Sequence, residues 1–120
     1  MTYASQTAIA NRHDFDKTFT AEYSANQTEG VLITPTTGKS LKIVGVHVTT
    51  AATSGKVRIW FDDDADGNEN TIATGYASDG GSTVVVQDNM VVRGARDEQL
   101  LITSTFGASS YFVAIDYKEE

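Results

Sequence analysis

The sequence predicts an all-β fold, a single antiparallel sandwich or barrel of about nine short strands. Apolar and polar residues alternate with a period of two in most segments, which is typical of half-buried strands. Turn-forming residues recur about every 8–12 residues, and no segment has a convincing apolar face at helical spacing. The 120 residues are enough for one domain with its own core.

The first two strands are predicted over residues 15–25 and 31–34. The first alternates almost strictly, with Phe19 and Tyr23 on one parity and Glu22 on the other. The second is a short apolar run that stops at Pro35, the only proline of the chain, and a turn follows it.

The third strand, over residues 41–48, changes parity within its length. Leu41 and Ile43 occupy odd-numbered positions, whereas Val46 and Val48 occupy even-numbered positions. A bulge at Gly45 returns the later apolar residues to the core face and directs His47 outward. The alternative is a strand buried on both faces, which places His47 inside.

The remaining strands follow the same logic. Val57, Ile59 and Phe61 alternate with Arg58 and Trp60, and the pattern resumes at residues 71–76 after an acidic loop, which predicts a hairpin. Four further strands are predicted over residues 83–86, 90–93, 99–103 and 111–117. The inward parities predict a core of Phe19, Val31, Ile33, Leu41, Ile43, Val57, Ile59, Phe61, Leu100, Ile102, Val113 and Ile115.

The chain divides into a sandwich domain over residues 15–120 and a polar N-terminal arm over residues 1–14. The arm has too few apolar residues to build a core, so we expect contacts with another subunit to order it. The formal charge of −7 disfavours binding to nucleic acid or to an anionic membrane. The absence of Cys excludes thiol nucleophiles, disulfides and zinc ribbons.

The acidic loop after the fourth strand contains Asp62, Asp64, Asp66 and Gly67, the spacing of the first half of a calcium-binding loop. Ala73 stands where an EF-hand has its bidentate Glu, and strands replace the flanking helices, so an EF-hand is excluded. Two interpretations remain. The sequence favours a solvated hairpin tip over a calcium site completed by other groups.

Candidate interface residues lie in two places. Arg12 and His13 belong to the arm, whereas Arg58 and Trp60 lie on the parity of the fourth strand that faces away from the core. Trp and Arg are typical interface anchors, and an exposed indole also suits stacking against a sugar ring. The alternative is that a loop of the same chain covers Trp60.

The sequence predicts that the protein is not an enzyme. His13 and His47 are the only histidines, and no Gly-x-Ser-x-Gly nucleophile elbow occurs. The chain also lacks a phosphate-binding glycine loop that follows a strand. No cofactor is expected, apart from the open question of calcium.

Four stretches of the chain carry a family resemblance: TGKSLKIVGVHV (37–48), GKVRIWF (55–61), RGARDEQL (93–100) and YFVAIDY (111–117). From about residue 28 onward, the chain resembles the small jelly-roll decoration, or cement, proteins of tailed bacteriophage capsids. The resemblance implies a jelly-roll-like sandwich in the virion, assembled in the host cytoplasm. It also implies a homotrimer, or another multimer, that binds the major capsid protein or other virion subunits and stabilises the shell.

Two other functions are compatible with the same sequence. One is a carbohydrate- or receptor-binding sandwich that uses Trp60 with or without calcium. The other is a component of the tail or of the head-completion complex, which shares the structural class but not the location.

The acidic loop generates a prediction about calcium. Because crowded carboxylates repel one another, a cation should stabilise the loop slightly if the tip is simply solvated. We therefore expect millimolar calcium to raise the melting temperature little relative to EDTA. A large upward shift in a thermal melt would instead establish a metal site.

Overall fold

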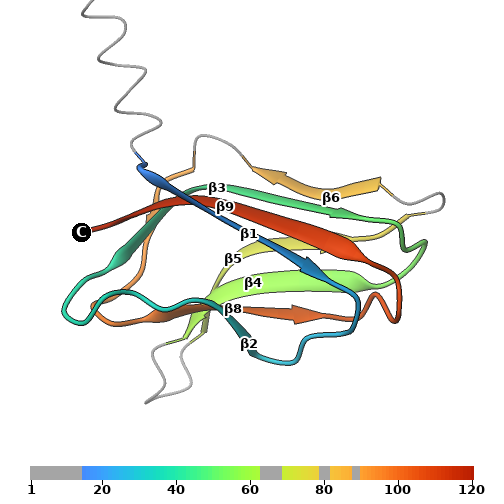
Figure 1. Cartoon of the computed structure of the whole chain (residues 1–120), viewed down its shortest axis with the longest axis horizontal. Coiled ribbons are helices and arrows are strands. Elements are labelled where there is room, and N and C mark those ends of the chain that lie inside the picture. The colour runs from blue at the N-terminus through green and yellow to red at the C-terminus, as the bar shows by residue number, and fades with distance from the viewer. Residues whose placement is uncertain (1–14, 63–68, 79–81, 88–89) are drawn as a thin grey trace, which may run out of the picture.

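The computed structural model describes residues 15–62, 69–78, 82–87 and 90–120. These residues form two antiparallel sheets that pack face to face (Figure 1). The strands are β1 (Lys17–Tyr23), β2 (Gly30–Ile33), β3 (Leu41–Thr50), β4 (Lys56–Asp62), β5 (Glu69–Tyr76), β6 (Ser82–Gln87), β7 (Val92–Arg93), β8 (Gln99–Ser104) and β9 (Tyr111–Glu119). The described residues contain no helix that could span a lipid bilayer.

The order of the strands makes the sandwich a jelly roll. Sheet 1 has the order β1-β9-β3-β6, and β7 also pairs with β3, so that β6 and β7 act as one interrupted edge strand. Sheet 2 has the order β2-β8-β4-β5. The pairs β1·β9, β2·β8, β3·β6/β7 and β4·β5 are nested from the ends of the chain inward, which is the jelly-roll arrangement. The all-β prediction is confirmed.

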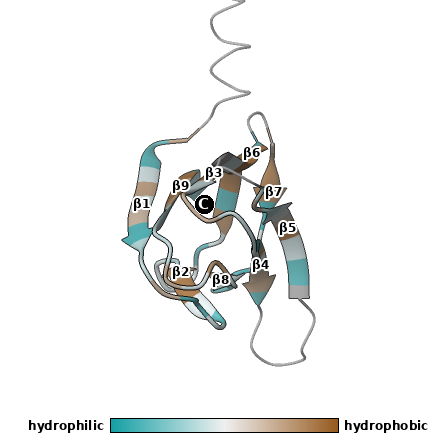
Figure 2. Ribbon diagram, turned by 90° about the vertical axis from the view of Figure 1, so that its right-hand side faces the viewer, coloured by the Kyte–Doolittle hydropathy of each residue, from teal (hydrophilic) through white to brown (hydrophobic). Residues whose placement is uncertain are grey.

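The core lies between the two sheets, which Figure 2 shows in end view. Ten of the twelve predicted core residues are buried, and Phe19 is partly buried against the cluster. The prediction was wrong for Val31, which is 49% exposed. The register of β2 against β8 shifts between Val31 and Ile33, so that Leu32 and Ile33 both enter the core.

The predicted bulge in β3 is confirmed. The register of β3 against β9 shifts between Ile43 and Gly45, and Val46 and Val48 then join Leu41 and Ile43 in the core. His47 consequently lies on the outer face of sheet 1, where it is half-buried. A side chain on Gly45 would approach the Asp116 carboxylate at 3.0 Å, so the bulge leaves little room there.

A buried tyrosine closes one end of the core. The hydroxyl of Tyr111 donates a hydrogen bond to the carbonyl of Ala25 at 3.2 Å and lies 2.7 Å from Ser104 Oγ. Ser104 Oγ in turn accepts a hydrogen bond from the backbone amide of Gln27 at 3.0 Å. The ring of Tyr23 stacks on Tyr111 at 5.2 Å. Desolvation raises the pKa of both tyrosines, so both stay neutral and able to donate. The network joins β8 and β9 to the connection between β1 and β2.

Glu119 ties three segments together at the opposite end. Its carboxylate accepts a hydrogen bond from Lys17 Nζ at 2.8 Å and further bonds from the backbone amide and hydroxyl of Thr36. These contacts join β9 to β1 and to the loop between β2 and β3. These contacts lower the pKa of Glu119 from 4.5 to about 2. The hydrogen bond from Lys17 is the largest cause, and the hydrogen bond from the backbone amide of Thr36 is the next.

Truncation of a core side chain tests this packing. Ile59→Ala should lower the free energy of unfolding by about 2–5 kcal/mol, because it removes buried contacts and leaves a cavity. Val31→Ala, at an exposed site of similar chemistry, should change it by no more than about 0.5 kcal/mol. Urea denaturation measures both variants. If Ile59→Ala and Val31→Ala lowered the free energy of unfolding equally, the observed register of β2 would be contradicted.

The Glu119 contacts predict a pH dependence. Because its folded pKa is depressed, ionised Glu119 stabilises the protein above about pH 4.5, and this stabilisation is lost as the pH falls towards 2. Glu119→Gln should therefore have a lower urea midpoint than wild type at pH 7, and the two midpoints should converge near pH 2. Glu22→Gln is the control and should follow wild type, because the Glu22 carboxylate has no partner among the described residues. A constant gap between Glu119→Gln and wild type at every pH would contradict the prediction.

Candidate functional site

The predicted calcium ligands are only partly placed by the structure. Asp62 ends β4, whereas Asp64 and Asp66 lie outside the described residues. In the described part of the chain, no group of three or more His, Cys, Asp or Glu side chains could hold a metal ion. The solvated hairpin tip that the sequence favours, and the calcium site that is its alternative, therefore both stay untested interpretations. Arg12 and His13 also lie outside the described residues, and their place in an interface stays a prediction as well.

Arg58 and Trp60 lie on the outer face of sheet 2, but the indole is not displayed. The guanidinium carbon of Arg58 lies 4.7 Å from the Trp60 ring centroid, and Arg58 Nε donates to Thr71 Oγ1 at 2.6 Å. Trp60 is only 1% exposed, so of the two interpretations that its sequence allowed, the indole open to a sugar or a partner is wrong and the indole covered by its own chain is right, with Arg58 lying over the ring. The physical reason is that Arg58 folds across the ring while β8 places Leu101 opposite it.

The outer face of sheet 1 displays an aromatic ring instead. Phe112 of β9 is 54% exposed, and in the register it lies between Glu22 of β1 and Thr49 of β3. The next row of this face contains Thr20, Ala114 and His47. Alternation along β9 explains the exposure, because Tyr111 and Val113 on the other parity are buried in the core.

A depression of about 450 Å³ lies beside Phe112 on this face. The side chains around it include Thr20, Glu22, His47, Thr49, Phe112 and Ala114. The small side chain of Ala114 lies between the longer side chains of neighbouring rows, which hollows the face. A second depression, of about 380 Å³, also borders Phe112 and Thr49 and extends to Thr83 of β6.

The charged groups around the first depression are acidic. Glu22 is exposed and has no hydrogen-bond or ion-pair partner in the described part of the chain, whereas Asp116, in the row after Ala114, accepts a hydrogen bond from Thr18 at 2.8 Å. The lining contains one imidazole, from His47, and no Lys, Arg, Ser or Cys. An open depression with an aromatic ring, hydroxyl groups and a carboxylate is suited to binding.

Sequence reasoning did not single out Phe112 or Glu22 as functional residues. The parity signal was available, because assigning Val113 and Ile115 to the core directs Phe112 to the surface. The sequence did not indicate that β1 would lie beside β9 and bring Glu22 opposite Phe112, since 90 positions separate the two residues. This juxtaposition comes from the jelly-roll closure of the first strand on the last.

The cover over Trp60 gives a spectroscopic prediction. Trp60 is the only tryptophan, so intrinsic tryptophan fluorescence reports on this ring alone. Arg58→Ala should shift the emission to the red and increase quenching by acrylamide, because it uncovers the indole. Arg93→Ala, which removes a guanidinium paired with Glu120, should leave both properties unchanged. Unchanged emission in Arg58→Ala would mean that other groups suffice to bury the ring.

The fold is similar to that of a chain in the acidic stable capsid structure of Helicobacter pylori bacteriophage KHP30, with a TM-score of 0.57. The match covers 88% of each chain at 12% sequence identity. Equal coverage means that the two chains are close in length and share the sandwich over most of it. The sequence matches no protein-family model and no curated protein. At this level of identity, the similarity shows a shared fold and does not by itself show a shared role.

Proposed function

We propose that the chain is a structural, non-enzymatic subunit of a bacteriophage virion that decorates the capsid and stabilises the shell. The observation that supports the proposal most directly is the shared fold with a chain of similar length in a phage capsid structure. The sequence resemblance to jelly-roll decoration proteins points in the same direction, over the stretches from residue 37 to residue 117. The proposal includes assembly as a homotrimer and attachment to the major capsid protein or another virion subunit.

The features of the sandwich fit a role in assembly. The depression beside Phe112 is open and bordered by an exposed aromatic ring, which suits association with another subunit, and the described residues of its lining offer no activated nucleophile. The carbohydrate-binding alternative depended on Trp60, and the ring of Trp60 is covered by Arg58. That observation removes the aromatic platform on which a sugar was expected to stack.

The decisive experiment is quantitative mass spectrometry of purified particles of the phage that encodes the chain. A decoration protein should be present at a copy number of the same order as the major capsid protein. A much lower copy number would instead indicate a tail or head-completion component. Absence of the chain from the particles would overturn a virion role altogether.

A second experiment tests the predicted arm. Deletion of residues 2–14 should leave a sandwich with near-normal melting, because the described core lies entirely within residues 15–120. The truncated protein should no longer attach to particles that lack the chain. Sedimentation of the full-length protein should give the mass of a trimer. Full attachment of the truncated protein, or a strictly monomeric chain with no macromolecular partner, would contradict the proposal.

A further inference from the structure

We propose that the depression beside Phe112 binds an arginine side chain of another virion subunit, with the guanidinium stacked on the Phe112 ring and paired with the Glu22 carboxylate. The chemistry of the site follows from the geometry of sheet 1. The identity of the partner as a virion subunit rests on the proposed function. The inference adds the surface of the chain that makes the contact and the chemical group that the surface recognises.

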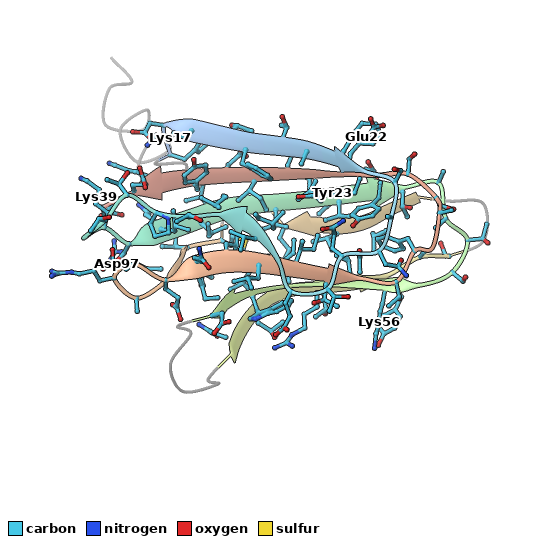
Figure 3. The ribbon with its side chains drawn as sticks, turned by 60° about the horizontal axis from the view of Figure 1, so that its bottom comes forward. Lys17, Glu22, Tyr23, Lys39, Lys56 and Asp97 are labelled. Carbon is cyan, nitrogen blue, oxygen red and sulfur yellow. The ribbon has the colours of Figure 1, made fainter. Side chains whose placement is uncertain are left out.

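The two recognition groups are already in place on the sheet. Glu22 of β1 and Phe112 of β9 are directly opposite each other in the antiparallel register, so their side chains rise from the same face as neighbours. Both are exposed, and Figure 3 shows Glu22 directed away from the sandwich. A planar cation above the ring can therefore reach the carboxylate without any movement of the backbone.

The charges around the depression select a cation. Glu22 has no partner among the residues that the structure describes, and Asp116 adds a second carboxylate one row beyond Ala114 on the same face. The lining contains no Lys or Arg that could neutralise them. The hydroxyl groups of Thr20 and Thr49 supply further acceptors for the several N–H donors of a guanidinium. A neutral sugar would leave the Glu22 charge uncompensated.

The same chain already shows this mode of recognition on its other sheet. Arg58 lies over the ring of Trp60 at 4.7 Å and donates to the hydroxyl of Thr71 at 2.6 Å. An aromatic ring and a threonine hydroxyl thus hold a guanidinium in place on sheet 2. Sheet 1 offers the equivalent ring and hydroxyl groups together with a carboxylate, and its guanidinium position is open.

Two considerations decide the identity of the occupant. Arginine fits better than lysine, because its flat guanidinium can stack on a ring and bond a carboxylate in a bidentate fashion at the same time. At this acidic face, another subunit fits better than a further copy of this chain, because a net charge of −7 favours a partner of opposite charge and adds repulsion between copies that contacts elsewhere must offset in the proposed homotrimer. The partner is therefore a polypeptide that presents an exposed arginine to this face.

The test is an NMR titration of the full-length protein with the peptide acetyl-Gly-Arg-Gly-amide. The peptide should shift the resonances of Phe112, Thr20 and His47, whereas the same peptide with citrulline in place of arginine should not. Glu22→Gln and Phe112→Ser should each weaken binding by roughly threefold to fivefold, the range for an exposed ion pair or cation–π contact. Both residues are exposed, so the fold should tolerate the substitutions.

Matched controls isolate the site. Glu29→Gln removes another exposed carboxylate, and Val86→Ser removes another exposed apolar side chain of sheet 1 that does not line the depression. Both should bind the arginine peptide as wild type does. The proposal is wrong if the peptide causes no shift at these residues or if all four variants bind equally. It is also wrong if methyl glucoside, and not the peptide, shifts the same resonances.

Two further measurements separate the occupant from the site and from the proposed function. If Glu22→Gln changes the sedimentation mass of the protein alone, the occupant is a second copy and the assignment to another subunit is wrong. If the chain is present in particles, Phe112→Ser and Glu22→Gln should reattach to stripped particles less tightly than Val86→Ser. Equal reattachment overturns the inference and leaves the virion role intact. Absence of the chain from particles overturns the virion role and the assignment of the partner to a virion subunit, and the peptide titration alone then decides whether the depression binds arginine.

Discussion

The bulge in β3 is the constraint on which the two faces of sheet 1 depend. β3 is the central strand that pairs with β9, β6 and β7, so its parity fixes the direction of side chains across the sheet. The register shift between Ile43 and Gly45 keeps four large aliphatic residues in the core on either side of the bulge. The same shift directs His47 to the outer face, beside Ala114. Without it, either the second half of β3 would expose its valines or His47 would be buried.

The two outer faces of the sandwich differ in what they offer to a partner. On sheet 2, Arg58 covers Trp60 within the same chain, and the exposed ring is that of Tyr76, which lies opposite Lys56. On sheet 1 the exposed ring is that of Phe112, which lies opposite Glu22, a carboxylate with no partner among the described residues. An exposed ring beside a depression is a typical anchor for association. The two faces differ in charge, because the exposed ring of sheet 1 lies beside a carboxylate and that of sheet 2 lies beside a lysine.

The ends of the sandwich are held by different chemistry. At one end, the buried hydroxyl of Tyr111 connects β9 to Ser104 and to the segment between β1 and β2. At the other end, Glu119 joins β9 to Lys17 and Thr36 through charged hydrogen bonds, and Glu120 pairs with Arg93. Both sets of contacts involve β9, which pairs with the first strand and with β3. The last strand thus fastens the beginning of the sandwich to its centre.

The sequence by itself determined the β class, the approximate positions of nine strands, the bulge in β3 and most of the core, because these follow from local alternation and turn chemistry. It misplaced Val31 because a register shift in β2 depends on pairing with β8, which no local pattern reports. It identified the outward parity of Trp60 but not its cover, since burial on an outer face depends on neighbouring side chains such as Arg58. Only the tertiary structure brought Glu22 beside Phe112, because the residues come from the first and last strands and meet through closure of the jelly roll.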